Sequence, residues 1–150
     1  MIVHNDTDRA TVISKINAIK LTKPWKIDAE PYTADRSTAQ NALLNAWYRD
    51  IAKHTGEGFA YTRGFMKFTY GVPILLARGE PEFHLLIEAM QEKMTYEQII
   101  NLMSGKSVSI SSAMNKTEFT DYLTMIEQHC ADRQIPLLRG DEYDLAMGIK

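Results

Sequence analysis

Helix-start signals constrain the fold of this chain more than any other feature, because each one fixes where a helix begins. Thr95 and Gln98 have the spacing of a capping box, in which two side chains satisfy the free N–H groups of a helix start. Asn115 and Glu118 repeat that pairing. Apolar residues at helical spacing follow both boxes. The chain therefore predicts two helices here. The first of these helices ends at Ser104-Gly105. The inward-facing residues of the second helix are Phe119, Tyr122, Leu123, Ile126 and Cys130.

A third box, made by Ser37 and Gln40, predicts a helix from about residue 36 to His54. Its apolar stripe consists of Leu43, Leu44, Trp47 and Ile51. A polar and increasingly basic stripe recurs every four residues and consists of Asn41, Asn45, Arg49 and Lys53. We interpret Trp47 as a core residue.

Further helices are expected over about residues 60–70 and from Pro81 onward, since proline suits the first turn of a helix. The sequence Gly71-Val72-Pro73-Ile74 predicts a break between them, because proline disfavours helical geometry in the residue before it. Residues 106–112 alternate as in a short strand or extended loop.

The N-terminal part predicts β structure around a helix. Residues 1–4 read as a short strand, and Asp6 to Asp8 offer helix-start residues. Residues 25–30 alternate apolar with charged side chains, which is typical of a half-buried strand with Trp25 on the buried face. We therefore expect an α+β fold, with a short N-terminal strand–helix–strand layer and a mainly helical remainder, in a single domain over residues 1–150.

The charge of the chain is divided unevenly. Residues 1–79 hold eleven Lys/Arg against seven Asp/Glu, whereas residues 80–150 hold six against twelve. The basic half is the better candidate for binding phosphate groups, although both halves could simply be solvated faces.

The N-terminus lacks the pattern of a signal peptide, and no apolar run is long enough to span a membrane. We expect a cytoplasmic protein without membrane contact.

Several motifs occur in an order typical of one phage family. They are Arg36-Ser37-x-x-Gln40-Asn41 at a helix start, Gly71-Val72-Pro73-Ile74-Leu75, Met94 to Gln98, and Ser112 to Leu123. Together they resemble the Orf/NinB (YbcN-type) recombination proteins of lambdoid phages and prophages. This chain differs at Ala42, where relatives often carry a basic residue.

The resemblance implies a non-enzymatic mediator that binds single-stranded DNA and helps to load a recombinase. It also implies a homodimer, contact with the host single-strand-binding protein, and no cofactor. A basic groove with aromatic side chains is what such binding requires. The candidate DNA-binding residues are Lys26, Arg36, Gln40, Asn41, Arg49, Lys53, Arg63 and Lys67. Arg36 lies just ahead of a helix start, where free N–H groups attract anions.

Two other functions stay open from the residues. The acidic half could dock a basic protein partner, which would make the chain an adaptor. Asp28-x-Glu30 beside Lys26 has the residue types of a metal-dependent nuclease, but in an unusual order. Cys130 has the spacing of a core residue, no phosphate-binding loop is present, and the four histidines are scattered, so we predict no enzyme.

Overall fold

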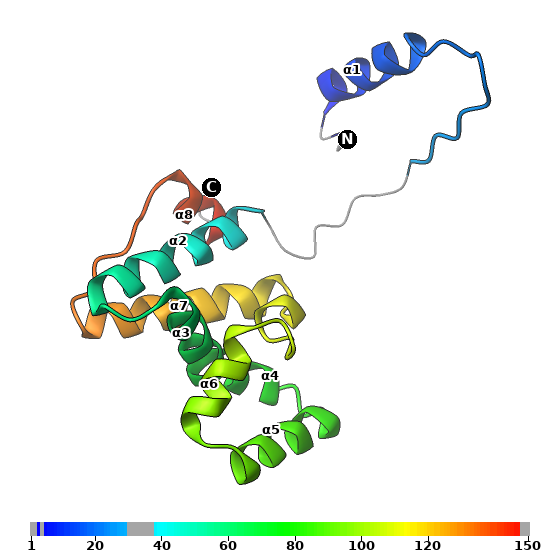
Figure 1. Cartoon of the computed structure of the whole chain (residues 1–150). Coiled ribbons are helices and arrows are strands. Elements are labelled where there is room, and N and C mark those ends of the chain that lie inside the picture. Colours follow the sequence, from blue (N-terminus) through cyan, green and yellow to red (C-terminus); the bar gives the residue numbers. More distant parts are fainter. Residues whose placement is uncertain (1–2, 4, 30–37, 148–150) are drawn as a thin grey trace. The chain divides into compact units, whose positions relative to one another are not determined.

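The computed structural model describes residues 3, 5–29 and 38–147, and it divides the chain into two compact units, Met1–Ala34 and Asp35–Lys150. The first unit contains helix α1 (Asp6–Asn17) followed by irregular chain. The second unit is a bundle of helices (Figure 1). Its elements are α2 (Thr38–Thr55), α3 (Phe59–Met66), the π-helical turn η1 (Lys67–Gly71), α4 (Val72–Leu76), α5 (Pro81–Lys93), α6 (Tyr96–Ser104), the 3₁₀ turn η2 (Ser111–Ala113), α7 (Lys116–Asp132) and α8 (Asp141–Ala146).

The predicted α+β class is wrong, because the described residues form helices and irregular segments without a strand. The expected strand at residues 1–4 lies largely outside the described residues. The expected strand at residues 25–30 is irregular chain as far as it is described, and Trp25 is 53% exposed instead of buried. Alternation alone does not make a strand, since a strand also needs a neighbour that accepts its backbone hydrogen bonds. The short strand offered as one alternative for residues 106–112 is also absent, since residues 106–110 form bends and irregular chain that lead into η2.

Helix α1 forms where its start residues predict. The side chain of Asn5 accepts a hydrogen bond of 2.9 Å from the backbone N–H of Asp8. None of the α1 residues is buried, so its apolar side chains, among them Ile13 and Ile16, remain exposed within the unit.

The capping boxes of α6 and α7 are confirmed. Thr95 and Gln98 exchange side-chain and backbone hydrogen bonds at the start of α6, and Asn115 and Glu118 do the same for α7. Arg78, which follows α4, donates to both carboxylate oxygens of Glu118 at 2.7 and 2.6 Å and to the carbonyl of Ala113 at 2.8 Å. The Arg78 hydrogen bonds hold the pKa of the Glu118 carboxyl below its usual value. This contact fixes the start of α7 against the end of α4.

The break predicted at Gly71–Ile74 is wrong, since the helix continues from α3 through η1 into α4. In the π-helical turn the Val72 N–H bonds to the Lys67 carbonyl, five residues back. Pro73 is the second residue of α4, and the π-helical turn before it accommodates a residue that has no backbone N–H. Gly71 is required here for packing: a Cβ at this position would lie 2.5 Å from Cγ2 of Ile110.

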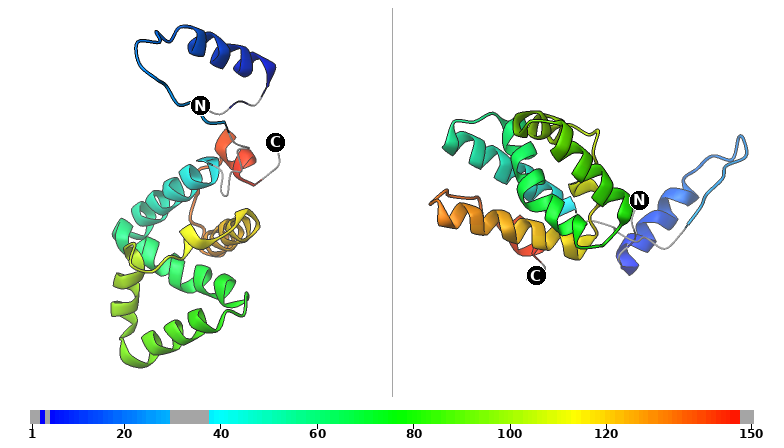
Figure 2. Two further views of the ribbon diagram at one scale, coloured as in Figure 1. Left: turned by 90° about the vertical axis from the view of Figure 1, so that its right-hand side faces the viewer. Right: turned by 90° about the horizontal axis from the view of Figure 1, so that it is seen from below.

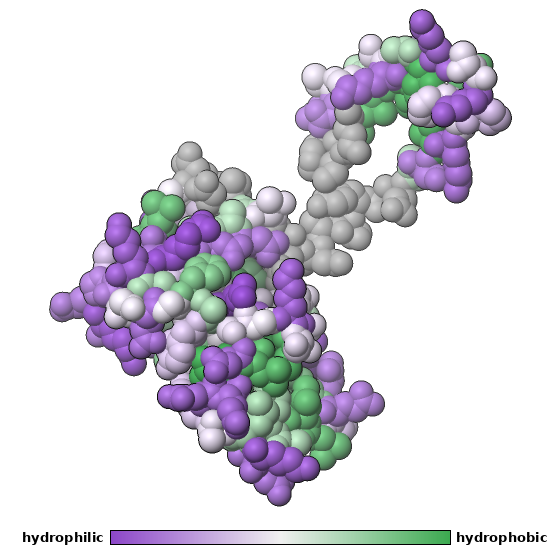
Figure 3. All heavy atoms as spheres, in the orientation of Figure 1, coloured by the Kyte–Doolittle hydropathy of each residue, from purple (hydrophilic) through white to green (hydrophobic). Residues whose placement is uncertain are grey.

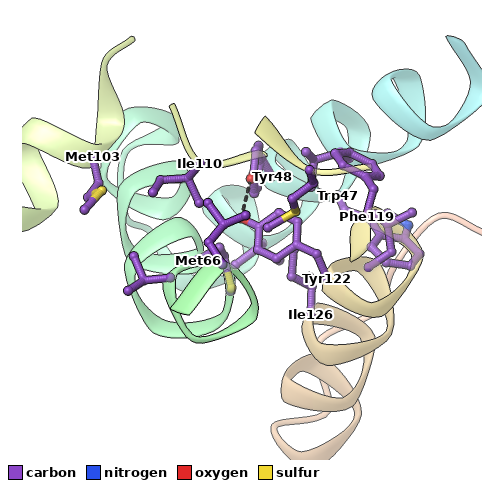
Figure 4. Packing of buried hydrophobic residues seen from close by; sticks show 14 of the residues in the cluster. Trp47, Tyr48, Met66, Met103, Ile110, Phe119, Tyr122 and Ile126 are labelled. Carbon is purple, nitrogen blue, oxygen red and sulfur yellow. Dashed lines mark hydrogen bonds between the residues drawn. The ribbon is translucent and has the colours of Figure 1, made fainter. Parts of the chain in front are cut away.

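The core of the second unit gathers buried side chains from α2, α3, α6 and α7 (Figure 4), and the predicted inward residues of α7 are all buried. At its centre the hydroxyls of Tyr48 and Tyr122 are hydrogen-bonded at 2.7 Å. Trp47 is fully buried, as predicted, and its indole N–H donates to the Leu138 carbonyl at 2.8 Å. Helix α2 contacts α8 on one side and α3 on the other, whereas α5 lies at the opposite end of the unit from α8 (Figures 1 and 2).

Candidate nucleic-acid interface

The basic stripe predicted on α2 is present on the surface of the second unit. Asn45, Arg49 and Lys53 are exposed, and we call these three residues the α2 stripe. Asn41, one turn earlier, is half-buried, and its carbonyl accepts a hydrogen bond of 3.1 Å from Asn45. Among the described residues no carboxylate lies within ion-pair distance of Arg49 or Lys53. Both charges are therefore available to a phosphate group.

A groove runs beside the end of this stripe. Lys53 and His54 line it together with Asp50 and residues 136–138, and its volume is about 610 Å³. Asp50 is held in place on one wall, since its carboxylate accepts the backbone N–H of Leu138 at 2.9 Å. The volume is within the range of about 300–1,000 Å³ typical of small-ligand sites. A nucleotide-sized group could therefore lie beside Lys53.

Arg63 and Lys67 have a structural role in this fold. Arg63 donates to the Ser104 carbonyl, and the ammonium of Lys67 lies 3.4 Å from the Gly105 carbonyl. These carbonyls belong to the end of α6, where a helix carries partial negative charge and cations are stabilising. Lys67 is only 8% exposed, and its burial, together with the nearby charge of Arg63, lowers its pKa. Neither residue offers its charge to DNA in this conformation.

Gln40 also belongs to the interior. Its side-chain amide donates to the Thr120 hydroxyl at 3.0 Å and to the Ala146 carbonyl at 3.1 Å, and the residue is fully buried. It therefore ties α2 to α7 and α8. Arg36 and Ser37 lie outside the described residues.

The first unit carries a basic segment, residues 15–26, which we call the lysine segment. It holds four lysines, Lys15, Lys20, Lys23 and Lys26, and no carboxylate, and all four are exposed. The Lys23 ammonium lies over the Trp25 ring, 5.8 Å from its centroid. Lys26 makes an ion pair of 3.2 Å with Asp28, but both side chains are largely exposed, so the pair is weak. An exposed tryptophan thus lies among free or weakly paired cations.

Residues with catalytic potential are engaged in other contacts. Asp28 pairs with Lys26, and its motif partner Glu30 lies outside the described residues. Cys130 is buried, as its spacing predicts, and burial raises the pKa of its thiol to about 11, so the thiolate is scarce at neutral pH. In the part of the chain that the structure describes, no three potential ligands gather as a metal site would require. None of its helices is long and apolar enough to cross a bilayer.

Comparison with known proteins gives no relative. No family model, no curated protein and no solved structure matches this chain.

Sequence reasoning missed the exposure of Trp25 because alternation assigned it to a buried strand face. The acid-free run of lysines around it was a signal for a solvated, basic segment. The structural role of Arg63 and Lys67 depends on contacts with residues about forty positions away, which no local pattern contains.

Proposed function

We propose that this chain is a non-catalytic protein that binds single-stranded DNA. The observation that carries the proposal is the exposed Trp25 within the lysine segment. Proteins that bind single strands without sequence preference combine aromatic rings, on which bases stack, with cations that follow the phosphate backbone. Trp25, with Lys23 over its ring, has both components within three residues. The irregular backbone of residues 18–29 leaves these side chains free to follow a flexible strand.

The α2 stripe supports the same function in the second unit. Arg49 and Lys53 are one helical turn apart, and neighbouring positions of that kind are about 5–6 Å apart at their Cβ atoms. Two such cations can contact adjacent phosphates of one strand. The lysine segment and the α2 stripe belong to different units, so they are two separate contact surfaces.

The role of recombination mediator rests on the resemblance of the chain's motifs to the Orf/NinB proteins. In this proposal the protein is a homodimer in the cytoplasm of the host cell. It binds exposed single strands there, contacts the host single-strand-binding protein, and helps to load a recombinase.

The test is fluorescence anisotropy with labelled single-stranded and double-stranded oligonucleotides over a salt series. We expect tighter binding to the single strand. The pair Lys23→Ala/Lys26→Ala and the pair Arg49→Ala/Lys53→Ala should each weaken binding. If both cations of a pair contact phosphate, the salt slope should fall by about 1.4, which is two contacts of about 0.7 each. Lys93→Ala/Lys106→Ala removes two exposed cations from the acidic half and is the matched control.

Equal weakening by the control pair would mean that only the total charge matters. Absence of binding at low salt would refute direct DNA binding.

A specific observation favours the adaptor as a second candidate. Helix α5 exposes Leu85 (65%) and Leu86 (43%), and Figure 3 shows hydrophobic side chains gathered over this part of the unit. Glu82, Glu88 and Glu92 are exposed on the same helix. An apolar patch with an acidic rim suits a partner segment that is both apolar and basic.

The two candidates are distinguished by Leu85→Asp, with the purified host single-strand-binding protein as the probe. An adaptor would lose its partner in this variant and keep it in Arg49→Ala/Lys53→Ala. Because the DNA-binding candidate also includes contact with this partner, the deciding result is oligonucleotide binding. A DNA-binding protein loses it in Arg49→Ala/Lys53→Ala and keeps it in Leu85→Asp, whereas an adaptor lacks it in the wild type.

A further inference from the structure

A small cavity opens between the end of α2, helix α3 and the end of α7, within the second unit. Its volume is about 220 Å³, and none of the candidate DNA-binding residues lines it. Tyr61 and Phe65 form one side, with ring centroids 6.4 Å apart and planes only 16° apart. Ile51, Met66 and Ile135 supply apolar side chains. The cavity is therefore largely apolar, with an aromatic wall.

His129 is the most distinctive polar group of this cavity. It is only 7% exposed, and its Nδ1 lies 2.5 Å from the Tyr70 hydroxyl. Burial lowers the pKa of the imidazole and raises that of the Tyr70 hydroxyl, so both are neutral at pH 7. The bond fixes the ring, and its other nitrogen, Nε2, points away from Tyr70. Among the described residues no hydrogen-bond partner of Nε2 is found.

Thr62 adds a second polar group. It is buried in α3 and lines the same cavity, and no described residue pairs with its hydroxyl. A polar group without a protein partner at a cavity wall is free to bond to water or to a bound molecule. Two neutral hydrogen-bonding groups beside the apolar and aromatic side chains favour a ligand with a polar edge and an apolar face.

The size of the cavity limits the ligand further. Sites for drug-sized molecules are typically about 300–1,000 Å³, so a cavity of about 220 Å³ suits a single small ring system. The Tyr61 side chain at the wall favours a planar ring, which can stack on it. Arg133 and Glu57 also line the cavity and bring opposite charges, which favours a neutral ring.

We propose that this cavity binds one nucleobase-sized heteroaromatic ring, stacked on Tyr61 and hydrogen-bonded at its edge by His129 Nε2 and the Thr62 hydroxyl. The ring can come from a free nucleoside or from an unstacked base of a strand. The proposal does not depend on strand binding through Trp25, since the ligand is recognised by other residues.

The experiment is an NMR titration of the ¹⁵N-labelled full chain with cytidine, thymidine, adenosine and guanosine, each tested separately, with ribose as the probe that lacks a base. A ligand of this size binds weakly, and NMR chemical shifts detect weak binding. We expect at least one nucleoside to shift the amide resonances around Thr62 and His129, and ribose to leave them unchanged.

Two variants locate the site. Thr62→Val keeps the volume and removes one hydrogen bond, so nucleoside binding should weaken about 3- to 10-fold. Tyr61→Leu should weaken it at least about 5-fold through lost stacking. Tyr96→Leu removes another exposed tyrosine, outside this cavity, and should bind as the wild type does. The spectra also report whether each variant is folded.

The proposal is overturned if no nucleoside shifts these resonances, if ribose shifts them equally, or if the folded Thr62 and Tyr61 variants bind as tightly as wild type. If an oligonucleotide competes with the nucleoside, the ring comes from a strand. If it does not compete, the ligand is a free nucleoside. Strand binding that persists in Thr62→Val, with nucleoside binding weakened, would separate the cavity from the proposed DNA contacts.

Discussion

Gly64→Ala tests the closest approach between two helices of the fold. Gly64 lies in α3, and a Cβ at this position would overlap the carbonyl oxygen of Ile100 in α6 and lie 3.1 Å from the backbone N of Ser104. The obstacle is backbone, so a side-chain rotation cannot relieve it. Helix α3 would have to move away from α6, which would also stretch the contacts of Arg63 and Lys67 with the end of α6.

The magnitude follows from two opposing terms. Alanine in place of glycine favours the helix by about 1 kcal/mol. Overpacking costs typically about 1–3 kcal/mol, and a backbone obstacle belongs in the upper part of that range. We expect a net loss of about 1–2 kcal/mol in the free energy of unfolding, with the melting temperature lowered by about 2–8 °C for a chain of this size.

The assay is thermal and urea unfolding followed by circular dichroism. Gly105→Ala is the matched control, because its added Cβ would have its nearest neighbour at 3.7 Å and its φ is −92°. We expect the control to change stability by no more than about 0.5 kcal/mol. A Gly64→Ala protein as stable as the wild type would refute the close packing of α3 on α6.

Three further predictions concern the second unit. Tyr48→Phe removes the hydrogen bond between the hydroxyls of Tyr48 and the fully buried Tyr122, and should lower the free energy of unfolding by about 1–3 kcal/mol. A urea midpoint equal to that of the wild type would contradict this prediction. Arg78→Ala should lower the free energy of unfolding at neutral pH. Because the folded pKa of Glu118 is lowered, the stabilisation from this ion pair is present above the unfolded pKa of the carboxyl and disappears as the pH falls through its folded pKa. A stability difference between wild type and variant that does not change with pH would argue against the pair. The Cys130 thiol, with a pKa of about 11, should react with a disulfide reagent at pH 8 only after denaturation, and fast labelling of the native protein would contradict its burial.

Helix starts were the part of this fold that the sequence predicted best. The boxes of Thr95 with Gln98 and Asn115 with Glu118 are complete within four residues, so they form wherever the tertiary contacts allow. The inward face of α7 was also predicted, because five apolar residues share one helical stripe. Local chemistry is sufficient for features of this kind.

The errors came from features that depend on distant partners. The alternation at residues 25–30 lacked a neighbouring strand, and the π-helical turn that accommodates Pro73 lies where Gly71 packs against the distant Ile110. Helix α8 was not predicted, although Gln40 bonds to its last residue, Ala146. The burial of Lys67 and Gln40 depends on residues 38 or more positions away, so their place among the candidate DNA contacts could not be judged from the sequence.

The most direct test of the central claim uses the two tryptophans of the chain, of which Trp25 is exposed and Trp47 is buried. Titration with a single-stranded oligothymidylate at low salt should quench the emission of Trp25 as bases stack on it, and added salt should reverse the effect. In Trp25→Phe only Trp47 remains, and its emission should not respond. Unchanged emission of the wild type at saturating oligonucleotide, or equal quenching in Trp25→Phe, would contradict binding through the lysine segment.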